Sequence, residues 1–443
     1  MTAAAIIAAP QLGWKRNLAF IWIGVFVGLL GANFVFPFVP FYLKELGVAD
    51  SSRRAYFTGL SGSATGLSLT LTAPIWGALA DRYGRKPMFL RALIGAGVLV
   101  ALMGLVTNAW QFVALRFCMG AFAGTMGAAA ALVAATTPRD RVGYSLGTLQ
   151  TGQFAANMLG PVLGGIVAST LGIRESFIFC SGLFLIAAVL AWVFVKEPKG
   201  ALGPALIGNE RRAEGGLLHN LKVVVAERQI LVMLALLFAL WLSTTFVRPV
   251  MPLSIDDFSS HKTAGDDGGV VLRLPGYVLA MKEEAATGVV FGVIGLTSTL
   301  AALAVAPLGQ RLGYRNCVVV AAALTGILYV PVSFAGGYGA FLLMLGAVGL
   351  FQGAMVPGTN ALIAASVPEG KQGSAFGLAA SMQSMALLVG PLGGGFTSGL
   401  FGIASVYAVI GVILVFASVF GYLFIREPDV FLQSANRVAS GGG

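Results

Sequence analysis

The chain alternates between long apolar stretches and short segments that hold almost all of its charge. Uncharged stretches of eighteen or more residues recur along its length. A helix needs about 20 apolar residues to cross the hydrocarbon core of a bilayer. We therefore predict twelve transmembrane helices, at about 18–40, 56–79, 87–107, 110–135, 143–170, 174–195, 228–252, 287–309, 316–335, 338–366, 373–400 and 404–425.

The pattern repeats once within the chain. MLGPVLGG (158–165) matches LVGPLGGG (388–395), and VFVKEP (193–198) matches LFIREP (423–428), both at a separation of 230 residues. This indicates a duplication of six helices with both copies in the same orientation, typical of parallel-repeat transporters. The expected organisation is a cytoplasmic N-terminus (1–17), a six-helix bundle (18–195), a cytoplasmic linker (196–227), a second six-helix bundle (228–425) and a cytoplasmic tail (426–443).

Composition and charge support a membrane protein over a soluble one. Of 443 residues, 57% are hydrophobic and 10% are charged. The net charge of +10 does not indicate nucleic acid, because 19 of the 28 Lys and Arg fall in loops on the side of the N-terminus and only seven on the other side. Positive loops stay in the cytoplasm. We expect both termini in the cytoplasm and the helices in the inner (plasma) membrane.

The residues give no support for an enzyme or an ATP-driven pump. No GxxxxGK[ST] phosphate loop occurs, and no acid pair, metal cluster or nucleophile motif falls in a predicted span. Cys118, Cys180 and Cys317 show no pair spacing, so we expect neither a disulfide nor a metal site. No cofactor is expected.

One connection, GALADRYGRK (77–86), concentrates charge between two uncharged spans. Its bases help to fix topology, but topology does not explain the acid or the glycines. The glycines allow a tight turn, and Asp81 can accept hydrogen bonds from a helix N-terminus or pair with Arg85. The corresponding stretch of the second half, GQRLGYR (309–315), has Gln310 in place of the acid.

Four motifs together resemble the twelve-helix drug:proton antiporters of the major facilitator superfamily, in particular MdtG-like and tetracycline exporters. They are the connection 77–86, Gly31 with PFVP (37–40), Arg116 with Gly120 and Gly124, and a helix 5 motif in which Ala156 replaces a usual glycine. The helix 5 motif comprises Gly147, Gly160, Pro161, Gly164 and Gly165.

The resemblance implies an all-α major facilitator fold of two six-helix bundles. It also implies a conformational latch that holds the halves in the outward-open state, formed by Gly77, Asp81, Arg82, Gly84, Arg85 and Lys86. The helix 5 glycines permit close helix contact and the proline permits a bend, which suits rocking of one half against the other.

Polar residues inside spans are the candidates for a substrate cavity. Gln150, Gln153 and Asn157 share one helix face by their spacing. An amide in a span also serves to join helices, so this alternative stays open for each. The predicted cavity residues are Asn33, Phe34, Phe38, Arg116, Gln150, Gln153, Asn157, Trp241, Thr245, Arg248, Gln352 and Asn360.

No Asp or Glu lies in the middle of a predicted span, which departs from what proton-coupled exporters of this kind usually show. Glu45, Asp81 and Glu175, at span ends, are the candidate proton carriers. Arg116 lies about 9 Å below the outer edge of its helix, at 1.5 Å per residue. Its partners must be carbonyls, amides, water or a substrate anion, unless its role is purely structural.

The predicted function is export of small amphipathic compounds by alternating access, driven by proton antiport. A lipid or lysolipid flippase, or an organic-anion transporter of the same fold, is the alternative. The expected partners are a small substrate, protons and the bilayer, with the chain acting as a monomer. The connection at about 254–286 is expected to be an outer loop of variable order with partly structured ends.

Overall fold

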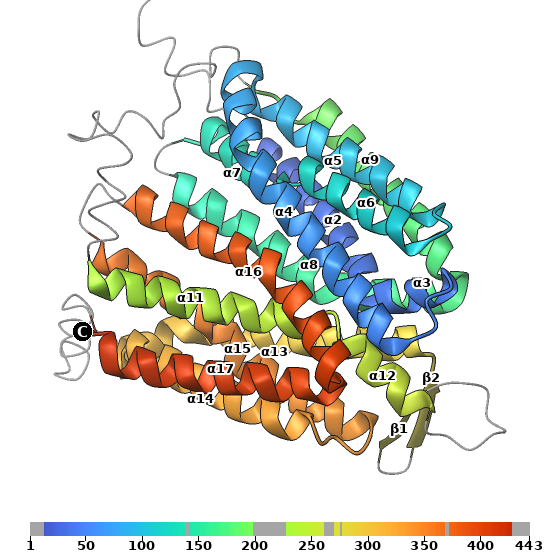
Figure 1. Ribbon diagram of the computed structural model, residues 1–443. Helices are drawn as coiled ribbons and strands as arrows, with labels where there is room; N and C mark the ends of the chain where they lie inside the picture. The colour runs from blue at the N-terminus through green and yellow to red at the C-terminus, as the bar shows by residue number, and fades with distance from the viewer. Residues whose placement is uncertain are drawn as a thin grey trace, which may run out of the picture.

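The computed structural model describes residues 13–138, 141–197, 227–260, 270–274, 277–367 and 372–427. Most of the predicted linker and of the predicted tail lies outside these residues, as do residues 1–12. The side chain of Asp81 and the surroundings of Gly77 also lie outside the description. The described chain is helical throughout, apart from one short hairpin and the turns (Figure 1).

The first half contains six membrane-crossing segments. Two of these segments are interrupted. The first span along the chain contains a 3-10 turn, and the fourth span is divided into two helices at Ala123 and Gly124. The elements are α2 (Trp14–Val35), η1 (Phe36–Phe38), α3 (Val39–Glu45), α4 (Ser51–Tyr83), α5 (Arg85–Gly104), α6 (Ala109–Phe122), α7 (Thr125–Thr136), α8 (Val142–Leu171) and α9 (Ile173–Phe194).

The second half repeats this order with one addition at the outer end. Its elements are α11 (Arg228–Val247), α12 (Met251–Ser260), β1 (Val270–Leu274), β2 (Tyr277–Met281), α13 (Glu283–Leu312), α14 (Tyr314–Val332), α15 (Tyr338–Ser366), α16 (Gln372–Phe401) and α17 (Ile403–Phe424). The strands β1 and β2 pair antiparallel, with Val270 opposite Met281. Part of the predicted outer loop is therefore a helix and a hairpin.

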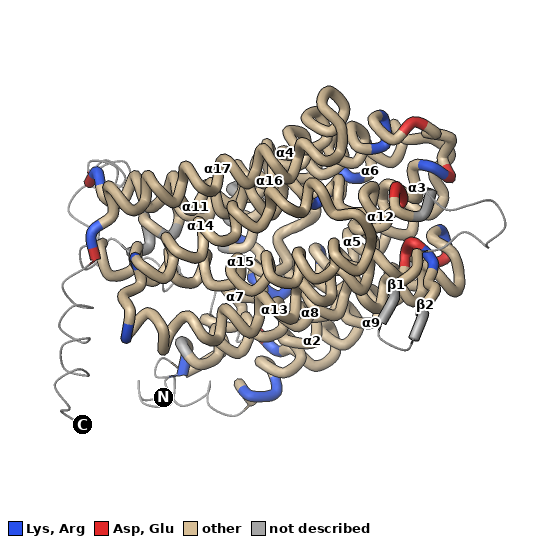
Figure 2. The backbone as a smooth tube through the Cα atoms, turned by 90° about the horizontal axis from the view of Figure 1, so that it is seen from below, with Lys and Arg blue, Asp and Glu red and all other residues tan. Residues whose placement is uncertain are grey.

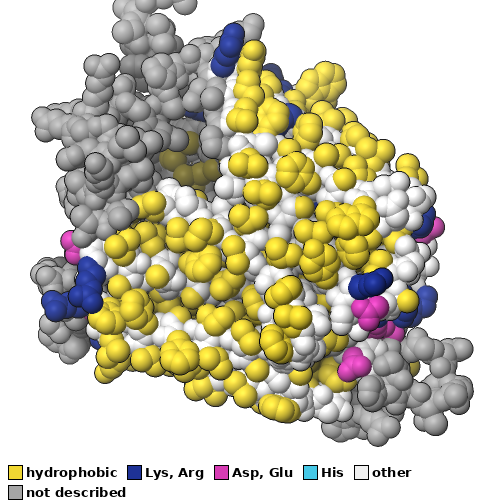
Figure 3. All heavy atoms as spheres, viewed as in Figure 1, with side chains coloured by type: hydrophobic (Ala, Val, Ile, Leu, Met, Phe, Trp, Pro, Cys, Tyr) yellow, Lys and Arg dark blue, Asp and Glu magenta, His cyan; other side chains and the backbone are white. Residues whose placement is uncertain are grey.

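Eleven of the described segments are long and apolar enough to span a membrane. The predicted span at 56–79 falls within α4, which has 33 residues but is rich in Ser, Thr and Gly. Apolar side chains cover the visible surface between two ends that carry the charged residues, as expected for a lipid-facing band (Figure 3). The fold prediction of a multi-span helical membrane protein is confirmed.

Each half has its own buried core. The first is built around residues such as Phe89, Phe112 and Phe177, and the second around residues such as Leu237 and Tyr407. Lipid is as apolar as these side chains, so close packing and hydrogen bonds, more than water exclusion, hold membrane helices together. The fit between helices therefore decides how the halves can move.

The two halves meet along two seams, α4 against α16 and α8 against α13. We call the end of the molecule with Glu45, Ser51 and Ser260 the outer end, and the end with Tyr83 and Phe424 the inner end. The helices α4 and α16 lie close at the outer end and diverge toward the inner end (Figure 1). Acidic residues gather around α3 and α12 at the outer end (Figure 2). The positive-inside rule predicts that the inner end faces the cytoplasm.

Candidate functional site

A hydrogen-bond relay joins the two halves at the level of the break in helix 1. Arg248, directly after α11, donates from Nη2 to the Oδ1 atom of Asn33 at 2.7 Å. Asn33 donates in turn to Oδ1 of Asn157 at 2.8 Å and to the carbonyl oxygen of Leu29 at 2.9 Å. The relay therefore connects α11 of the second half with α2 and α8 of the first.

A second arginine lies beside this relay. The guanidinium carbon of Arg116, on α6, is 5.2 Å from the centroid of the Phe36 ring, and that of Arg248 is 5.0 Å from the same centroid. Phe36 reaches this position because Pro37 follows it in the 3-10 turn η1, where the missing proline N–H costs little. Two guanidinium groups thus approach one aromatic ring from different halves of the protein.

Arg116 is poorly partnered for so buried a charge. The residue is 8% exposed, its Nη1 atom contacts only the sulfur of Met119 at 3.7 Å, and its Nε atom has no acceptor. Within the described part of the chain, neither Arg116 nor Arg248 forms an ion pair with a carboxylate. Of the two arginines, Arg248 and not Arg116 donates a hydrogen bond to Asn33.

The helix α8 is exposed on two opposite faces. Leu159, Leu163 and Ile166 form one, as expected for contact with lipid. Gln150 and Asn157 are exposed on the other face, about 180° around the helix axis at 3.6 residues per turn. Gln153 lies beside them and is half-exposed. This polar face lies between the side of α8 that packs on α2 and the side that packs on α13. It therefore borders the space between the halves.

Other predicted cavity residues lie elsewhere. Phe34 and Phe38 are each 1% exposed and belong to the first core, where Phe34 stacks on Phe179 at 5.9 Å. The side chain of Thr245 donates to the carbonyl oxygen of Ala386 at 2.9 Å. These three residues join elements within a half and do not line an open cavity in this conformation, because the rotation of each helix directs them inward.

The remaining predicted cavity residues are partly accessible. Gln352, on α15, donates to the hydroxyl oxygen of Ser243 at 3.2 Å, within the second half. Asn360 and Trp241 are half-buried, and Trp241 packs against the second core. The structure therefore brings together Asn33, Arg116, Asn157 and Arg248 near Phe36, and among the described residues no hydrogen bond joins Gln352, Asn360 or Trp241 to that group.

The helix 5 motif forms part of the seam between the halves. A Cβ atom at Gly165 would lie 2.7 Å from the carbonyl oxygen of Glu284 and 3.2 Å from the Cα atom of Gly288. Gly160 and Gly164 face α2 instead, where Gly160 approaches Asn33. A Cβ at Gly147 would meet nothing within 4 Å. Three of the motif glycines thus allow contacts that a side chain would block.

The second seam uses glycines that the sequence did not single out. A Cβ at Gly66 of α4 would lie 2.9 Å from the carbonyl carbon of Leu387 on α16, and Gly59 packs against Pro391. Ser63 accepts a hydrogen bond from the backbone N–H of Leu392 at 3.1 Å, next to Pro391, which has no N–H of its own. All of these contacts lie in the outer halves of both helices.

An ionic cluster closes the outer end. A carboxylate oxygen of Asp256, on α12, lies 2.8 Å from Nη1 of Arg54 on α4, and its other oxygen lies 3.4 Å from Nζ of Lys44 on α3. The side chains of Arg54 and Asp256 are 6% and 14% exposed. The predicted seventh span ends at about residue 252, whereas the apolar segment in the structure runs through α12 to Phe258, with Leu253 and Ile255 buried.

The charged connection 77–86 is organised by an acid from the end of helix 6. Glu197 accepts hydrogen bonds from the backbone N–H groups of Arg85 at 2.9 Å and Lys86 at 3.0 Å, at the positive N-terminal end of α5. Lys86 donates from Nζ to the carbonyl oxygen of Trp192 at 2.7 Å. Gly84 makes the turn with a φ of 97°, a value that side chains disfavour.

The second half repeats this arrangement. Glu427 accepts hydrogen bonds from the N–H groups of Tyr314 and Arg315, both at 2.7 Å, and Gly313 makes the turn. Glu197 and Glu427 occupy the same position in the repeated sequences VFVKEP and LFIREP. The repeat predicts a duplication, but by itself it does not predict these contacts. The contacts of this connection that the structure describes stay within one half, and Asp81 lies outside the described side chains.

Of the candidate proton carriers, Glu45 is 4.0 Å from Arg174, and both side chains are 44% exposed. Glu175 lies in the first turn of α9. Both are at the outer end.

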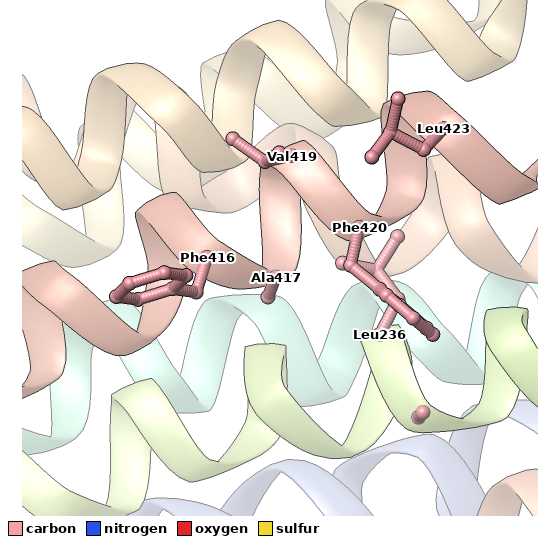
Figure 4. Close-up of a pocket in the computed structure, with 7 residues that line it drawn as sticks. Leu236, Phe416, Ala417, Val419, Phe420 and Leu423 are labelled. Carbon is pink, nitrogen blue, oxygen red and sulfur yellow. The ribbon is translucent and has the colours of Figure 1, made fainter.

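An apolar groove of about 430 Å³ lies between α11 and α17, and only apolar side chains line it, among them Leu236, Phe416 and Phe420 (Figure 4). It offers no polar side chain to a substrate.

Comparison with curated proteins shows relatives along nearly the whole chain. The Multidrug resistance protein MdtG of Yersinia enterocolitica is 29% identical over 430 residues, which cover 96% of this chain and 97% of the relative. The protein of the same name from Salmonella typhimurium is 28% identical over 425 residues, with coverage of 95% and 98%.

Solved structures share the fold at low identity. The nucleoside transporter NupG superposes with a TM-score of 0.73 at 11% identity, and the human organic anion transporter MFSD10 with a TM-score of 0.63 at 17% identity. Each alignment covers 93% of this chain and 100% of the other. The model of the Major Facilitator Superfamily matches residues 21–280 and 274–438. The chain therefore belongs to the Major Facilitator Superfamily, and it is a multi-span membrane transporter, not an enzyme.

Proposed function

We propose that this transporter exports small amphipathic compounds, antimicrobials among them, by alternating access, and that inward movement of protons drives the export. The observation that carries the proposal is the arrangement of the halves. Glycine-mediated seams and the cluster around Asp256 hold them together at the outer end, while α4 and α16 diverge at the inner end. A shadowed recess between the halves is visible in the space-filling view (Figure 3).

This arrangement suits a protein that takes up its cargo from the inner side. The group around Phe36 lies where the seams begin, so a compound entering between the halves would meet Asn33, Arg248 and the polar face of α8 first. Release outward would require the outer contacts to open. The name of the MdtG relatives, Multidrug resistance protein, supports drugs as the cargo.

The proton route we propose uses carboxylates at the outer end. In this proposal Asp256 joins Glu45 and Glu175 as a carrier. Glu45 is already accessible from the outer end, and Asp256 would become accessible when the seams open. An acid whose charge closes the outer end links protonation to conformation, because the protonated form loses its attraction to Arg54. These acids link the outside pH to opening of the outer end, and net entry of the proton additionally requires its release on the inner side.

The test is expression in a bacterium that lacks its own efflux pumps, with a panel of lipophilic antimicrobials. We expect raised tolerance to at least one compound with the native chain and none with Gly165→Leu, which blocks the seam between α8 and α13. Gly147→Ala, at a position with free space, is the matched control and should behave as the native chain. No change for any compound, with insertion shown for the native chain, would contradict drug export.

An organic-anion transporter is the second candidate. It is favoured by the two arginines near Phe36, which have no carboxylate partner among the described residues.

A further inference from the structure

We propose that Arg116 and Arg248 together form an anion-binding site, and that the preferred substrates carry a carboxylate or similar anionic group on an apolar body. This inference rests on the proposed function and names its substrate class. The site is shared between the halves, since Arg116 belongs to α6 and Arg248 follows α11.

The first argument is charge. The guanidinium carbons of Arg116 and Arg248 lie 5.2 and 5.0 Å from the same ring centroid, so they are at most about 10 Å apart, and their like charges repel each other. A buried arginine is costly unless an acid or several acceptors compensate it. Arg248 has the amide oxygen of Asn33, whereas Arg116 has only a weak sulfur contact besides the Phe36 ring. One anion placed near both would remove the repulsion and supply the missing acceptors.

The second argument is the set of unused donors. The Nε atom of Arg116 is completely buried and has no acceptor, which is rare for a charged group. Arg248 uses Nη2 for Asn33, and its other donors make no hydrogen bond within the described residues. Guanidinium donors form a planar fork that matches a carboxylate. The donor set therefore fits an oxyanion better than a cation or a neutral molecule.

The third argument is the apolar surface next to the charge. The ring of Phe36 lies against both guanidinium groups. An apolar body attached to the anion can contact the ring and the walls between the halves. The polar face of α8, with Gln150 and Gln153, leads toward the site from the inner end.

The site also gives the anion a role in the transport cycle. Arg116 and Arg248 come from different halves, so an anion bound to both would hold the two halves together near Phe36. Asn33 would keep Arg248 oriented, since it also bonds Asn157 on α8. A ligand without the charge would bind to the apolar surface but would not bridge the arginines.

The test compares three matched fluorescent probes on the purified full-length protein in nanodiscs: 1-pyrenebutyrate, 1-pyrenebutanol and 1-pyrenebutylammonium. Empty nanodiscs correct for partition into lipid. We expect the native protein to bind the butyrate roughly tenfold more tightly than the alcohol, as charge-assisted hydrogen bonds predict. Arg116→Gln and Arg248→Gln should each lose this preference while keeping the affinity for the alcohol. Arg53→Gln, which changes an exposed arginine at the outer end, is the control and should keep it.

Equal binding of butyrate and alcohol by the native protein, or tighter binding of the ammonium probe, would overturn the anion site. So would a preference for butyrate that survives both substitutions. If the variants do not insert, the selectivity of the native protein among the three probes still decides. Efflux of a cationic dye, measured separately, distinguishes the two proposals: export of that dye without any preference for anions would leave drug export standing and remove the anion site.

Discussion

Asp256→Asn should shift the transporter toward its outward-open state. The substitution keeps the size of the side chain and removes the charge that Arg54 and Lys44 face. When the outer end is closed, the ion pair between Asp256 and Arg54 is largely buried, with 2.8 Å between the carboxylate oxygen and Nη1. Separation of the halves would place both groups in water. The loss therefore destabilises the closed arrangement more than the open one.

The magnitude follows from the burial of the pair. Breaking a fully buried ion pair costs about 3–5 kcal/mol. Asp256 retains some exposure, and an asparagine oxygen can still accept a hydrogen bond, so we expect a loss of about 1–3 kcal/mol from the closed state. That corresponds to a change of about 5- to 150-fold in the ratio of open to closed molecules.

The assay is a distance distribution between spin labels on exposed residues of the two halves, at Ala49→Cys and Ala280→Cys, in a background without the native cysteines. The native chain should give mainly the short distance, and Asp256→Asn a population at longer distance. Asp50→Asn is the control, because it removes a carboxylate at the same end and asparagine caps α4 equally well. A distribution for Asp256→Asn that matches this control would refute the gating role of Asp256.

Three further predictions concern the connections and seams. Glu197→Gln and its counterpart Glu427→Gln should each lower the free energy of unfolding by about 1 kcal/mol, since each weakens two hydrogen bonds at a helix N-terminus, and thermal unfolding measures this. Gly165→Leu should abolish transport in vesicles without preventing membrane insertion, because the added side chain has no room; near-normal transport would contradict the seam. Asp81→Asn should slow turnover more than it weakens equilibrium binding, and a collapse of binding with normal turnover would remove the latch.

Much of the fold was predictable from the sequence because membrane spans need long apolar runs, and this chain supplies them in two matching sets. The helix 5 glycines were also predictable as contact points, as Gly165 at the seam shows. The role of Glu197 was hidden, because an acid after a span looks like an ordinary loop residue. Only the fold brings it to the N-terminus of α5.

The site itself was harder to predict. Asp256 looked like part of a solvated loop, since nothing in the local pattern shows that Arg54 lies opposite it, 202 positions earlier in the chain. Phe34 and Phe38 lie in a segment that is apolar on all sides. Its pattern of polar and apolar residues therefore cannot distinguish the face toward the core from the face toward the cavity. Arg116 was prominent as a charge inside a span, but its neighbour Arg248 comes from the other half and could be found only in three dimensions.

The most direct test of the account is transport by the purified protein in liposomes with an imposed pH gradient. An amphipathic antimicrobial identified in the tolerance assay is placed on the side of the inner end, and the acidic compartment is on the side of the outer end. We predict that the compound accumulates against its own gradient on the acidic side, and that this stops when the pH gradient is collapsed or when Gly165→Leu replaces the native chain. Movement no faster than in protein-free liposomes would contradict export, and movement that ignores the pH gradient would contradict proton antiport.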